Sequence, residues 1–523
     1  MGERREPAGR RWLLWLGLIT LAGLGVRLAA VFGRPVRLTV SDAYYYHNSA
    51  NALAEGLGFI NPFDYYLHHA HQHVATAAFP PMFTFLLLPA SLVGFKSFLA
   101  HRVWTSIIGT AGIVVCGYAA KEIGGRRTGL AAAALVAVYP NLWMSDALVL
   151  SEALSPLVVG LVLLAAYRFW RRPRLSSVAF FGFTLGVAAL TRDELTLLTV
   201  LVLLPLALLA KLSWRRRLGL LGAGGLVAAL VVAPWVGYNL SRFKQTTFIS
   251  TGLGATLVSA NCHATWYGPY EGYWSFPCAL RAPIKPKSAQ VDESVQDIEG
   301  RHIAWTFIKA HAGRIPEVAL ARIGRAFGLF RPFQQVHLDA SVENRPYGWA
   351  LTGLWMYYAL CPLAVGGLVV LRRRRVPVFP LLAVGLVVVI SVVVTFGQTR
   401  YRSTFEVSLV ILAAEALARA WELLRGAPAG AHRARGRRPG THPPAQSDGS
   451  SAGNDAGGPP AVALPSLSQA RGAVPALSRS TGRRRSPSST PPGTGRPGGS
   501  GPGPAPRGAR PGWAPWPAAP STG

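Results

Sequence analysis

The sequence predicts an all-helical integral membrane protein that crosses the bilayer many times. Half of its 523 residues are hydrophobic, and they form blocks of about 20 residues, the length that an α-helix needs to span a bilayer. Short clusters of arginine lie beside these blocks, as expected of loops that stay in the cytoplasm. Membrane topology therefore explains the formal charge of +30, and we expect no nucleic acid among the partners of the protein.

Hydropathy and the arginine clusters together predict about 10–11 transmembrane helices. The predicted spans lie near residues 12–32, 98–120, 127–144, 148–169, 176–191, 195–212, 217–238, 349–371, 376–396 and 404–424. The first block is too long for the apolar part of a signal peptide, which favours a retained anchor. With the N-terminus in the cytoplasm, the arginine-rich loops lie inside the cell, and the two long segments 33–97 and 239–348 lie outside.

Five regions follow from this topology. They are a basic cytoplasmic N-terminus at 1–11, a transmembrane core at 12–238 with a first outer loop at 33–97, a modest extracytoplasmic segment of mixed character at 239–348, C-terminal transmembrane helices at 349–425 and a tail at 426–523. Pro, Gly, Ser, Ala and Arg dominate the tail, which predicts a disordered cytoplasmic segment. High usage of Ala, Gly, Arg and Pro is typical of a GC-rich bacterial genome, so we expect a bacterial plasma membrane, with both termini cytoplasmic.

Three shorter segments of the outer regions also predict helices. Residues 43–57 carry apolar side chains at helical spacing and could lie flat on the membrane surface. Residues 79–95 are apolar but short, and a full span there would turn the later arginine clusters outward, so a re-entrant or interfacial helix is favoured. Residues 292–310 begin with acidic side chains and continue with apolar and aromatic residues at helical spacing.

The four cysteines divide into two pairs. Cys116 and Cys361 lie inside apolar blocks and are expected to be packing residues. Cys262 and Cys278 lie in one aromatic loop on the predicted outer side, where an oxidising compartment favours a disulfide. Two free thiols are the alternative for this second pair.

A histidine tract occupies the first outer loop. His69, His71 and His73 alternate along it and could bind a divalent transition metal ion. No carboxylate or cysteine stands at a fixed spacing from them, so the alternative is a polar loop without a metal. No other cofactor is indicated: the sequence carries no Walker loop and no Rossmann fingerprint.

Asp42 is the most informative single residue of the sequence. It lies just beyond the first predicted span, in the run SDAYYYH. A carboxylate beside lipid is costly, and at this position it could take a proton from a molecule that arrives from outside. The alternative is a purely structural role, because Ser41 or Asp42 could cap the predicted helix at 43–57.

Other charged side chains lie at the outer ends of later spans. Glu152 begins one span, Arg192 and Glu194 lie in a turn between two spans, and Arg400 and Arg402 precede the last span. Arginines on the outer side break the positive-inside pattern, and they can hold a phosphate through paired hydrogen bonds. The turn with Arg192 could instead be a charged interfacial turn that caps the next helix.

Carboxylates and arginines on one outer face favour the transfer of a group from a lipid phosphate. The carboxylates could act as a base and an orienting group, and the arginines could hold the anionic leaving group. A polytopic transporter or lipid flippase is the alternative, although transporters more often place polar residues near the middle of the bilayer. A non-catalytic scaffold that works through its basic tail is a third interpretation.

The order of these motifs resembles a known family. The motifs are SDAYY at Asp42 with AEGLGF behind it, the Pro80-Pro81 pair, Tyr139-Pro140 with Ser151-Glu152, LTRDE at Arg192 and RYR at Arg400. Over roughly residues 12–425 they resemble a polytopic GT-C glycosyltransferase of family 39, the protein O-mannosyltransferase and aminoarabinose-transferase type. The chain departs from this pattern at Phe79, where relatives often carry a basic residue or histidine, and in its modest outer segment.

The resemblance implies an outward-facing active site and a polyprenyl-phosphate-linked monosaccharide as donor. The sugar would pass, with inversion, to an extracytoplasmic acceptor in the cell envelope: a glycan, a lipid or a protein. By that analogy the catalytic residues are Asp42, as general base, and Glu152. The residues expected to bind the donor phosphate are Arg192, Arg400 and Arg402, and those expected to contact a substrate are Tyr45, Glu55 and Glu194.

Overall fold

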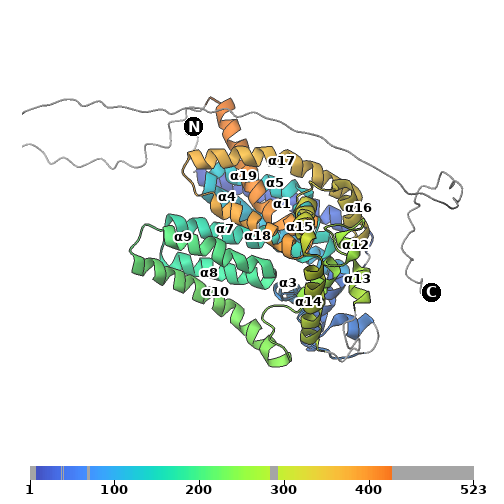
Figure 1. Cartoon of the computed structure of the whole chain (residues 1–523). Helices are drawn as coiled ribbons and strands as arrows, with labels where there is room; N and C mark the ends of the chain where they lie inside the picture. The colour runs from blue at the N-terminus through green and yellow to red at the C-terminus, as the bar shows by residue number, and fades with distance from the viewer. Residues whose placement is uncertain (1–7, 37, 39–40, 68–70, 283–291, 427–523) are drawn as a thin grey trace, which may run out of the picture. The chain divides into compact units, whose positions relative to one another are not determined.

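The computed structural model describes residues 8–36, 38, 41–67, 71–282 and 292–426 (Figure 1). Within these ranges the regular structure is helical, apart from one isolated bridge between Ile60 and Ala75. The all-helical class predicted from the sequence is confirmed. The predicted disorder of the tail concerns residues 427–523, which lie outside the described ranges.

The helices keep the labels of Figure 1 throughout. They are α1 (Ala8–Phe32), α2 (Asp42–Ala54), α3 (Met82–Leu92), α4 (Phe98–Gly124), α5 (Arg126–Val138), α6 (Pro140–Trp143), α7 (Ser155–Arg171), α8 (Leu175–Thr191), α9 (Leu204–Leu209), α10 (Trp214–Arg242), α11 (Leu253–Ala260), α12 (His263–Trp266), α13 (Phe276–Arg281), α14 (Glu293–Ala310), α15 (Ile315–Ala326), α16 (Pro332–Val342), α17 (Tyr347–Arg373), α18 (Phe379–Val394) and α19 (Ser403–Leu424). Three short 3₁₀ turns also matter below: Ser151–Leu154, Asp193–Thr196 and Thr399–Arg402.

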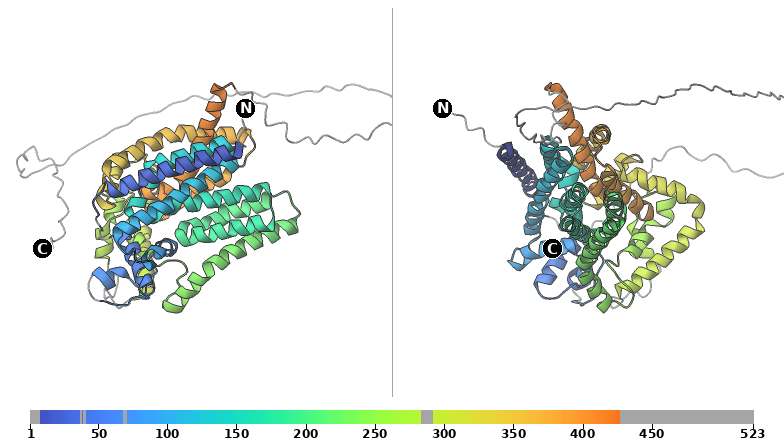
Figure 2. Two further views of the ribbon diagram at one scale, coloured as in Figure 1. Left: turned by 180° about the vertical axis from the view of Figure 1, so that it is seen from behind. Right: turned by 90° about the vertical axis from the view of Figure 1, so that its left-hand side faces the viewer.

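Five helical stretches of the described chain are long and apolar enough to cross a membrane. They are Gly9–Phe32, Phe98–Gly124, Ser151–Arg171, Trp214–Arg242 and Tyr347–Arg373. Helices α3, α8 and α18 are apolar but shorter. Figure 2 shows the long helices running side by side. The prediction of a multi-pass membrane protein is therefore confirmed.

Two predicted helices of the first outer loop have different surroundings. Helix α3 has 11 residues, which makes it about 16 Å long against a hydrocarbon core of about 30 Å. This length supports a re-entrant or interfacial helix. The prediction that the helix at 43–57 lies flat on the membrane was wrong, because most of α2 is buried inside the protein, including Tyr45, Tyr46 and His47.

The predicted span at 195–212 is helical from Asp193 to Leu209, but the type of helix changes along it. It begins with the 3₁₀ turn Asp193–Thr196, continues as a wide turn at Thr199–Leu203 and ends in the six-residue helix α9. Pro205 lies in the first turn of α9 and has no N–H to donate to the preceding turn, which is the wide turn Thr199–Leu203. A single wide turn of this kind occurs inside otherwise continuous helices.

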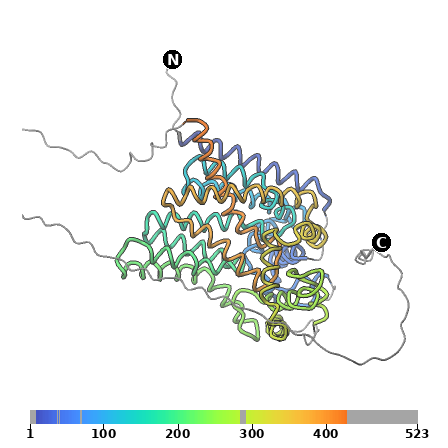
Figure 3. Tube along the Cα trace, turned by 45° about the horizontal axis from the view of Figure 1, so that its top comes forward, coloured from blue at the N-terminus to red at the C-terminus, as the bar shows by residue number. Residues whose placement is uncertain are grey.

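The segment between α10 and α17 is a group of short helices. The predicted helix at 292–310 is confirmed as α14, and the Asp292 side chain caps it by accepting from the Ser294 N–H at 2.9 Å. Helices α12–α16 gather with α3 at one end of the bundle (Figures 1 and 3). We refer to this end, which the sequence analysis places outside the cell, as the outer end.

A glycine sets the close approach of α17 and α19, and a matched pair of variants tests it. A Cβ at Gly367 would collide with the carbonyl oxygen of Leu412, whereas the nearest atom to a Cβ at Gly366 is the Ala416 Cβ at 3.6 Å. We expect Gly367→Ala to lower the free energy of unfolding by about 1–3 kcal/mol through overpacking. Gly366→Ala should leave it equal or slightly higher, because alanine favours helix. Thermal unfolding in detergent measures both, and equal shifts would contradict this packing argument.

Candidate active site

Arg400 lies at the centre of a group of ion pairs at the outer end. It sits on the 3₁₀ turn Thr399–Arg402, between α18 and α19. Its Nη2 lies 2.7 Å from Oδ2 of Asp42, its Nε lies 2.7 Å from Oε1 of Glu152, and its Nη1 lies 3.4 Å from Oε1 of Glu343. One arginine thereby joins the first outer loop, the 3₁₀ turn before α7 and the C-terminal end of α16.

Glu152 connects Arg400 to a second arginine. Arg192, which ends α8, places Nη1 2.6 Å from the same Oε1 and Nε 2.5 Å from Oε1 of Glu194. The Glu152 side chain is 0% exposed, and its other oxygen has no hydrogen-bond partner among the described residues. A buried carboxylate is tolerated when it is paired, and here two guanidinium groups share one oxygen.

The structure adds two residues that the sequence analysis missed. Glu343 lies at the C-terminal end of α16, and its Oε2 is 2.6 Å from Nε of Arg345. Asn344 between them has a φ of 56°, and its carbonyl accepts a hydrogen bond from Arg34 at 2.9 Å. A signal for them existed: an acidic and a basic residue stand just before a long span, as Asp42 stands just after one.

These side chains form one connected group, which we call the ionic cluster. It comprises Asp42, Glu152, Arg192, Glu194, Glu343, Arg345 and Arg400. Burial by itself lowers the pKa of the Arg400 guanidinium, but the nearby carboxylates outweigh this and hold that pKa well above its ordinary value. Burial raises the pKa of Glu343 against the opposing effect of Arg345 and Arg400. Four carboxylates face three guanidinium groups, so the cluster has no surplus of positive charge.

Of the three carboxylates that contact Arg400, Asp42 is the most exposed to solvent. Its side chain is 28% exposed, against 0% for Glu152 and 6% for Glu343. Ser41 occupies the N-cap position of α2, and Asp42 is the first residue of the helix, with its carboxylate on Arg400. Asp42 is therefore not simply a helix cap.

Arg402 does not join the ionic cluster, although the sequence analysis grouped it with Arg400. Its Nε lies 2.7 Å from Oε1 of Glu406, its guanidinium carbon lies 3.6 Å from the ring centre of Tyr357, and its side chain is 1% exposed. Successive residues of a 3₁₀ turn are about 120° apart around the axis, so side chains two positions apart leave on different sides. The prediction that Arg402 contacts a donor phosphate finds no support in this placement.

Two of the predicted substrate contacts also lie apart from the ionic cluster. The Tyr45 side chain is buried, its hydroxyl lies 3.3 Å from Oγ1 of Thr76, and its ring packs against Phe79. Glu55 faces the surface, where Oε1 pairs with Nζ of Lys96 at 3.1 Å. Glu194, the third, belongs to the ionic cluster through Arg192.

The predicted metal site falls partly outside the described residues. His69 lies in the range that the structure leaves undescribed, while His71 and His73 both pack edge-to-face against the ring of Tyr65. Among the residues described, no group of three or more His, Cys, Asp or Glu side chains could hold a metal ion. The metal interpretation of the histidine tract remains a hypothesis.

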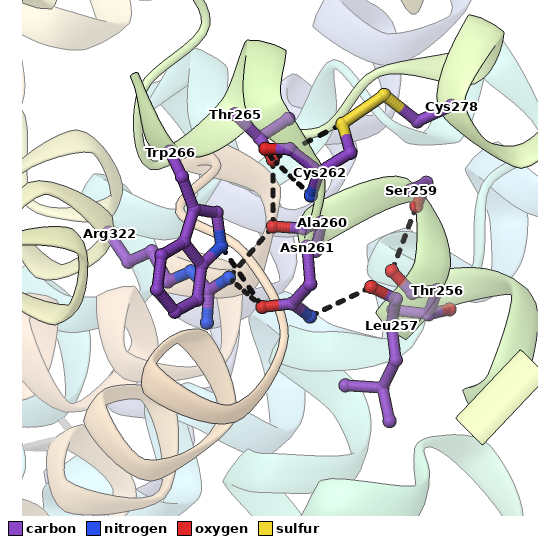
Figure 4. The surroundings of a disulfide bond; sticks show 10 residues. All are labelled: Thr256, Leu257, Ser259, Ala260, Asn261, Cys262, Thr265, Trp266, Cys278 and Arg322. Carbon is purple, nitrogen blue, oxygen red and sulfur yellow. Dashed lines mark hydrogen bonds between the residues drawn. A yellow bond between two sulfur atoms is a disulfide. The ribbon is translucent and has the colours of Figure 1, made fainter. Parts of the chain in front are cut away.

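The predicted cysteine pair forms a disulfide in the structure. Cys262 and Cys278 are joined with a Cα–Cα distance of 6.4 Å (Figure 4). Asn261, next to Cys262, accepts hydrogen bonds on its side-chain oxygen from Nε1 of Trp266 at 3.2 Å and from Nη2 of Arg322 at 2.9 Å (Figure 4). Cys116 and Cys361 are free.

The ionic cluster offers two chemical abilities at one place. Asp42 presents a carboxylate that solvent reaches and that can accept a proton. Arg400 presents a permanently charged guanidinium that can hold a phosphate through two hydrogen bonds. The buried carboxylates Glu152 and Glu343 contact the other nitrogens of that guanidinium and orient it.

Comparison with known proteins places part of this chain in context. Residues 78–238 match the family model described as dolichyl-phosphate-mannose-protein mannosyltransferase. This range includes Glu152, Arg192 and Glu194 but not Asp42 or Arg400. Among curated protein sequences, no relative matches the chain.

Two solved structures are similar in part. The Archaeoglobus fulgidus oligosaccharyltransferase AglB, in complex with an inhibitory peptide and a dolichol-phosphate, is 17% identical, with a TM-score of 0.48 over 79% of this chain and 51% of that chain. ArnT from Cupriavidus metallidurans, bound to undecaprenyl phosphate, is 15% identical, with a TM-score of 0.34 over 79% of each chain. The chain thus spans about half the length of the archaeal enzyme. The resemblance to polytopic glycosyltransferases of the GT-C type that the sequence motifs indicate is confirmed by the family match over residues 78–238.

Proposed function

We propose that the protein is an inverting membrane glycosyltransferase. It moves a monosaccharide from a polyprenyl-phosphate donor to a hydroxyl of an extracytoplasmic acceptor. The observation that carries this proposal is the pairing of the exposed Asp42 carboxylate with Arg400, at 2.7 Å, at the outer end of a membrane bundle. A base and a phosphate-binding cation then stand side by side, as this reaction requires.

Asp42 and Arg400 would act at opposite ends of the transferred bond. The acceptor oxygen attacks the anomeric carbon of the sugar from the face opposite the phosphate, and its proton passes to Oδ2 of Asp42. The bond between the anomeric carbon and the phosphate oxygen breaks, and its electron pair leaves with the polyprenyl phosphate. Arg400 stabilises the negative charge that grows on that phosphate.

Donor binding would also activate the base. The Asp42 carboxylate is the partner of Arg400 Nη2. A donor phosphate would compete for this guanidinium, which releases Asp42 to accept a proton. Glu152 holds Nε of Arg400 on the shielded side, so the guanidinium keeps its orientation during the exchange.

Consumption of the donor distinguishes this proposal from transport. The protein in proteoliposomes should release one polyprenyl phosphate for each new glycosidic bond. Mass spectrometry of the lipid and acceptor extracts measures both products. The acceptor for this assay is found by comparing the cell-envelope glycans and glycoproteins of cells that have the protein with those of cells that lack it. A flippase would move the intact lipid-linked sugar across the bilayer and form no glycosidic bond, and that result would overturn the proposal.

A further inference from the structure

We infer that the disulfide-closed segment 260–278 is a positioning element that holds Arg400 ready for a lipid phosphate. This inference rests on the proposed function and extends it to a part of the chain that touches no substrate. We call residues 260–278 the stapled segment, because the disulfide between Cys262 and Cys278 closes all of it except Ala260 and Asn261.

The stapled segment holds the chain just before Arg400 by two direct contacts. The Gly397 N–H donates to the carbonyl of Gly272 at 2.8 Å. Nε2 of Gln398 donates to the hydroxyl of Tyr273 at 3.3 Å. Gly272 and Tyr273 lie inside the loop that the disulfide closes, so we expect a wider loop to shift the turn that carries Arg400.

Arg322 of α15 ties the same two parts of the chain together a second time. Its Nη1 donates to the carbonyl of Val393, at the end of α18, at 2.7 Å. Its Nη2 donates to the carbonyl of Ala260 and to the side-chain oxygen of Asn261, both at 2.9 Å (Figure 4). The guanidinium therefore links the chain that enters the Arg400 turn with the residues beside Cys262.

Close backbone packing makes this link stiff. A Cβ at Gly397 would collide with the backbone of Arg322, so the chain before Arg400 lies directly against α15. Gly272 has a φ of 72°, and a Cβ there would press on the backbone of Ala321 and Arg322. Two glycines thus allow the stapled segment, α15 and the Arg400 turn to pack as one unit.

A second route reaches Arg400 through a side chain. Nε2 of Gln398 also donates to Oε1 of Glu343, and this oxygen is 3.4 Å from Nη1 of Arg400. The stapled segment therefore sets both the backbone position of Arg400 and the position of one of its carboxylate partners. Without the staple, we expect the guanidinium to sample orientations that do not suit a phosphate.

Binding of undecaprenyl phosphate to the full-length protein in lipid nanodiscs tests the inference. The Cys262→Ser, Cys278→Ser double variant should bind this lipid about tenfold more weakly than the unmodified protein, as expected for coupling through packed neighbours. Cys361→Ser is the matched control, since this free cysteine lies in α17, and it should bind normally. Unchanged binding by the double variant would overturn the inference.

The decisive measurement compares lipid binding with and without the disulfide in a protein that also carries Arg400→Lys. The staple acts through Arg400, so its removal should cause little further loss once the guanidinium is gone. A full additional loss of about tenfold would mean that the staple supports the protein in another way, and the inference would be wrong.

A second variant tests the inference even if the cysteine double variant folds poorly. Tyr273→Phe keeps the disulfide and removes the hydroxyl that contacts Gln398, and it should weaken lipid binding. Tyr270→Phe, in the same segment, is its control and should bind normally; equal binding by the two would count against the inference. If the unmodified protein itself fails to bind undecaprenyl phosphate, the proposed donor class falls, and this inference falls with it.

Discussion

Asp42→Asn should lower the rate of sugar transfer by about 10²–10⁴-fold, the usual contribution of a general base. Asparagine keeps the shape of the side chain and loses the oxygen that accepts the proton. Donor affinity should stay equal or rise, because the carboxylate no longer competes with the donor phosphate for Arg400. Single-turnover transfer by the reconstituted protein, with donor binding measured separately, checks both statements.

Glu55→Gln is the matched control for Asp42→Asn. Glu55 is a carboxylate of the same outer loop, but it pairs with Lys96 at the surface and lies outside the ionic cluster. This variant should transfer sugar at nearly the normal rate. Full activity in Asp42→Asn, or an equal loss in Glu55→Gln, would show that Asp42 is not the base.

Glu152→Gln should strongly destabilise the protein. Its Oε1 faces Arg192 at 2.6 Å and Arg400 at 2.7 Å, and the side chain is 0% exposed. A neutral amide would leave these two guanidinium groups without their shared charge, and removing one partner of a buried pair costs about 3–5 kcal/mol. Thermal unfolding in detergent should show a large fall in the midpoint.

Glu122→Gln is the comparison for this loss of stability. Glu122 pairs with Arg171 at 3.4 Å, and both side chains are partly exposed, at 28% and 47%. An exposed pair contributes about 0–1 kcal/mol, so this variant should unfold close to the normal temperature. Similar small shifts in both variants would mean that Glu152 does not hold the two arginines together.

The fold class follows from features that are visible in one sequence. Apolar blocks of bilayer length and arginine clusters at their ends predict membrane helices, because lipid leaves a chain few ways to satisfy its backbone. The type of helix within a block, and what covers each helix, were harder to predict. Residues 195–212 are apolar throughout most of their length, and the change from 3₁₀ to wide to α-helical turns within them is not visible in their pattern. Helix α2 is buried although its pattern suits a membrane surface.

For the residues of the candidate site, the sequence predicted the side of the membrane on which they lie. It did not predict the direction in which their side chains point. Asp42, Glu152 and Arg400 share the predicted outer face, and the structure joins them. Arg402 shares that face as well, but the 3₁₀ turn directs it to Glu406 in the protein interior. Glu343 was missed, since its outer segment carries many charges and hydropathy does not distinguish a buried one.

The sequence by itself determined that this chain is a helical membrane protein and which charged residues lie at the ends of its spans. Hydropathy and charge act over short stretches of chain, so one sequence reveals them. Only the tertiary structure decided which of those charges meet, because Asp42 and Arg400 are separated by 358 positions. Their contact depends on the packing of α2, α7, α8 and α16 around one turn, and that packing is set by side-chain shape and turn geometry rather than by local composition.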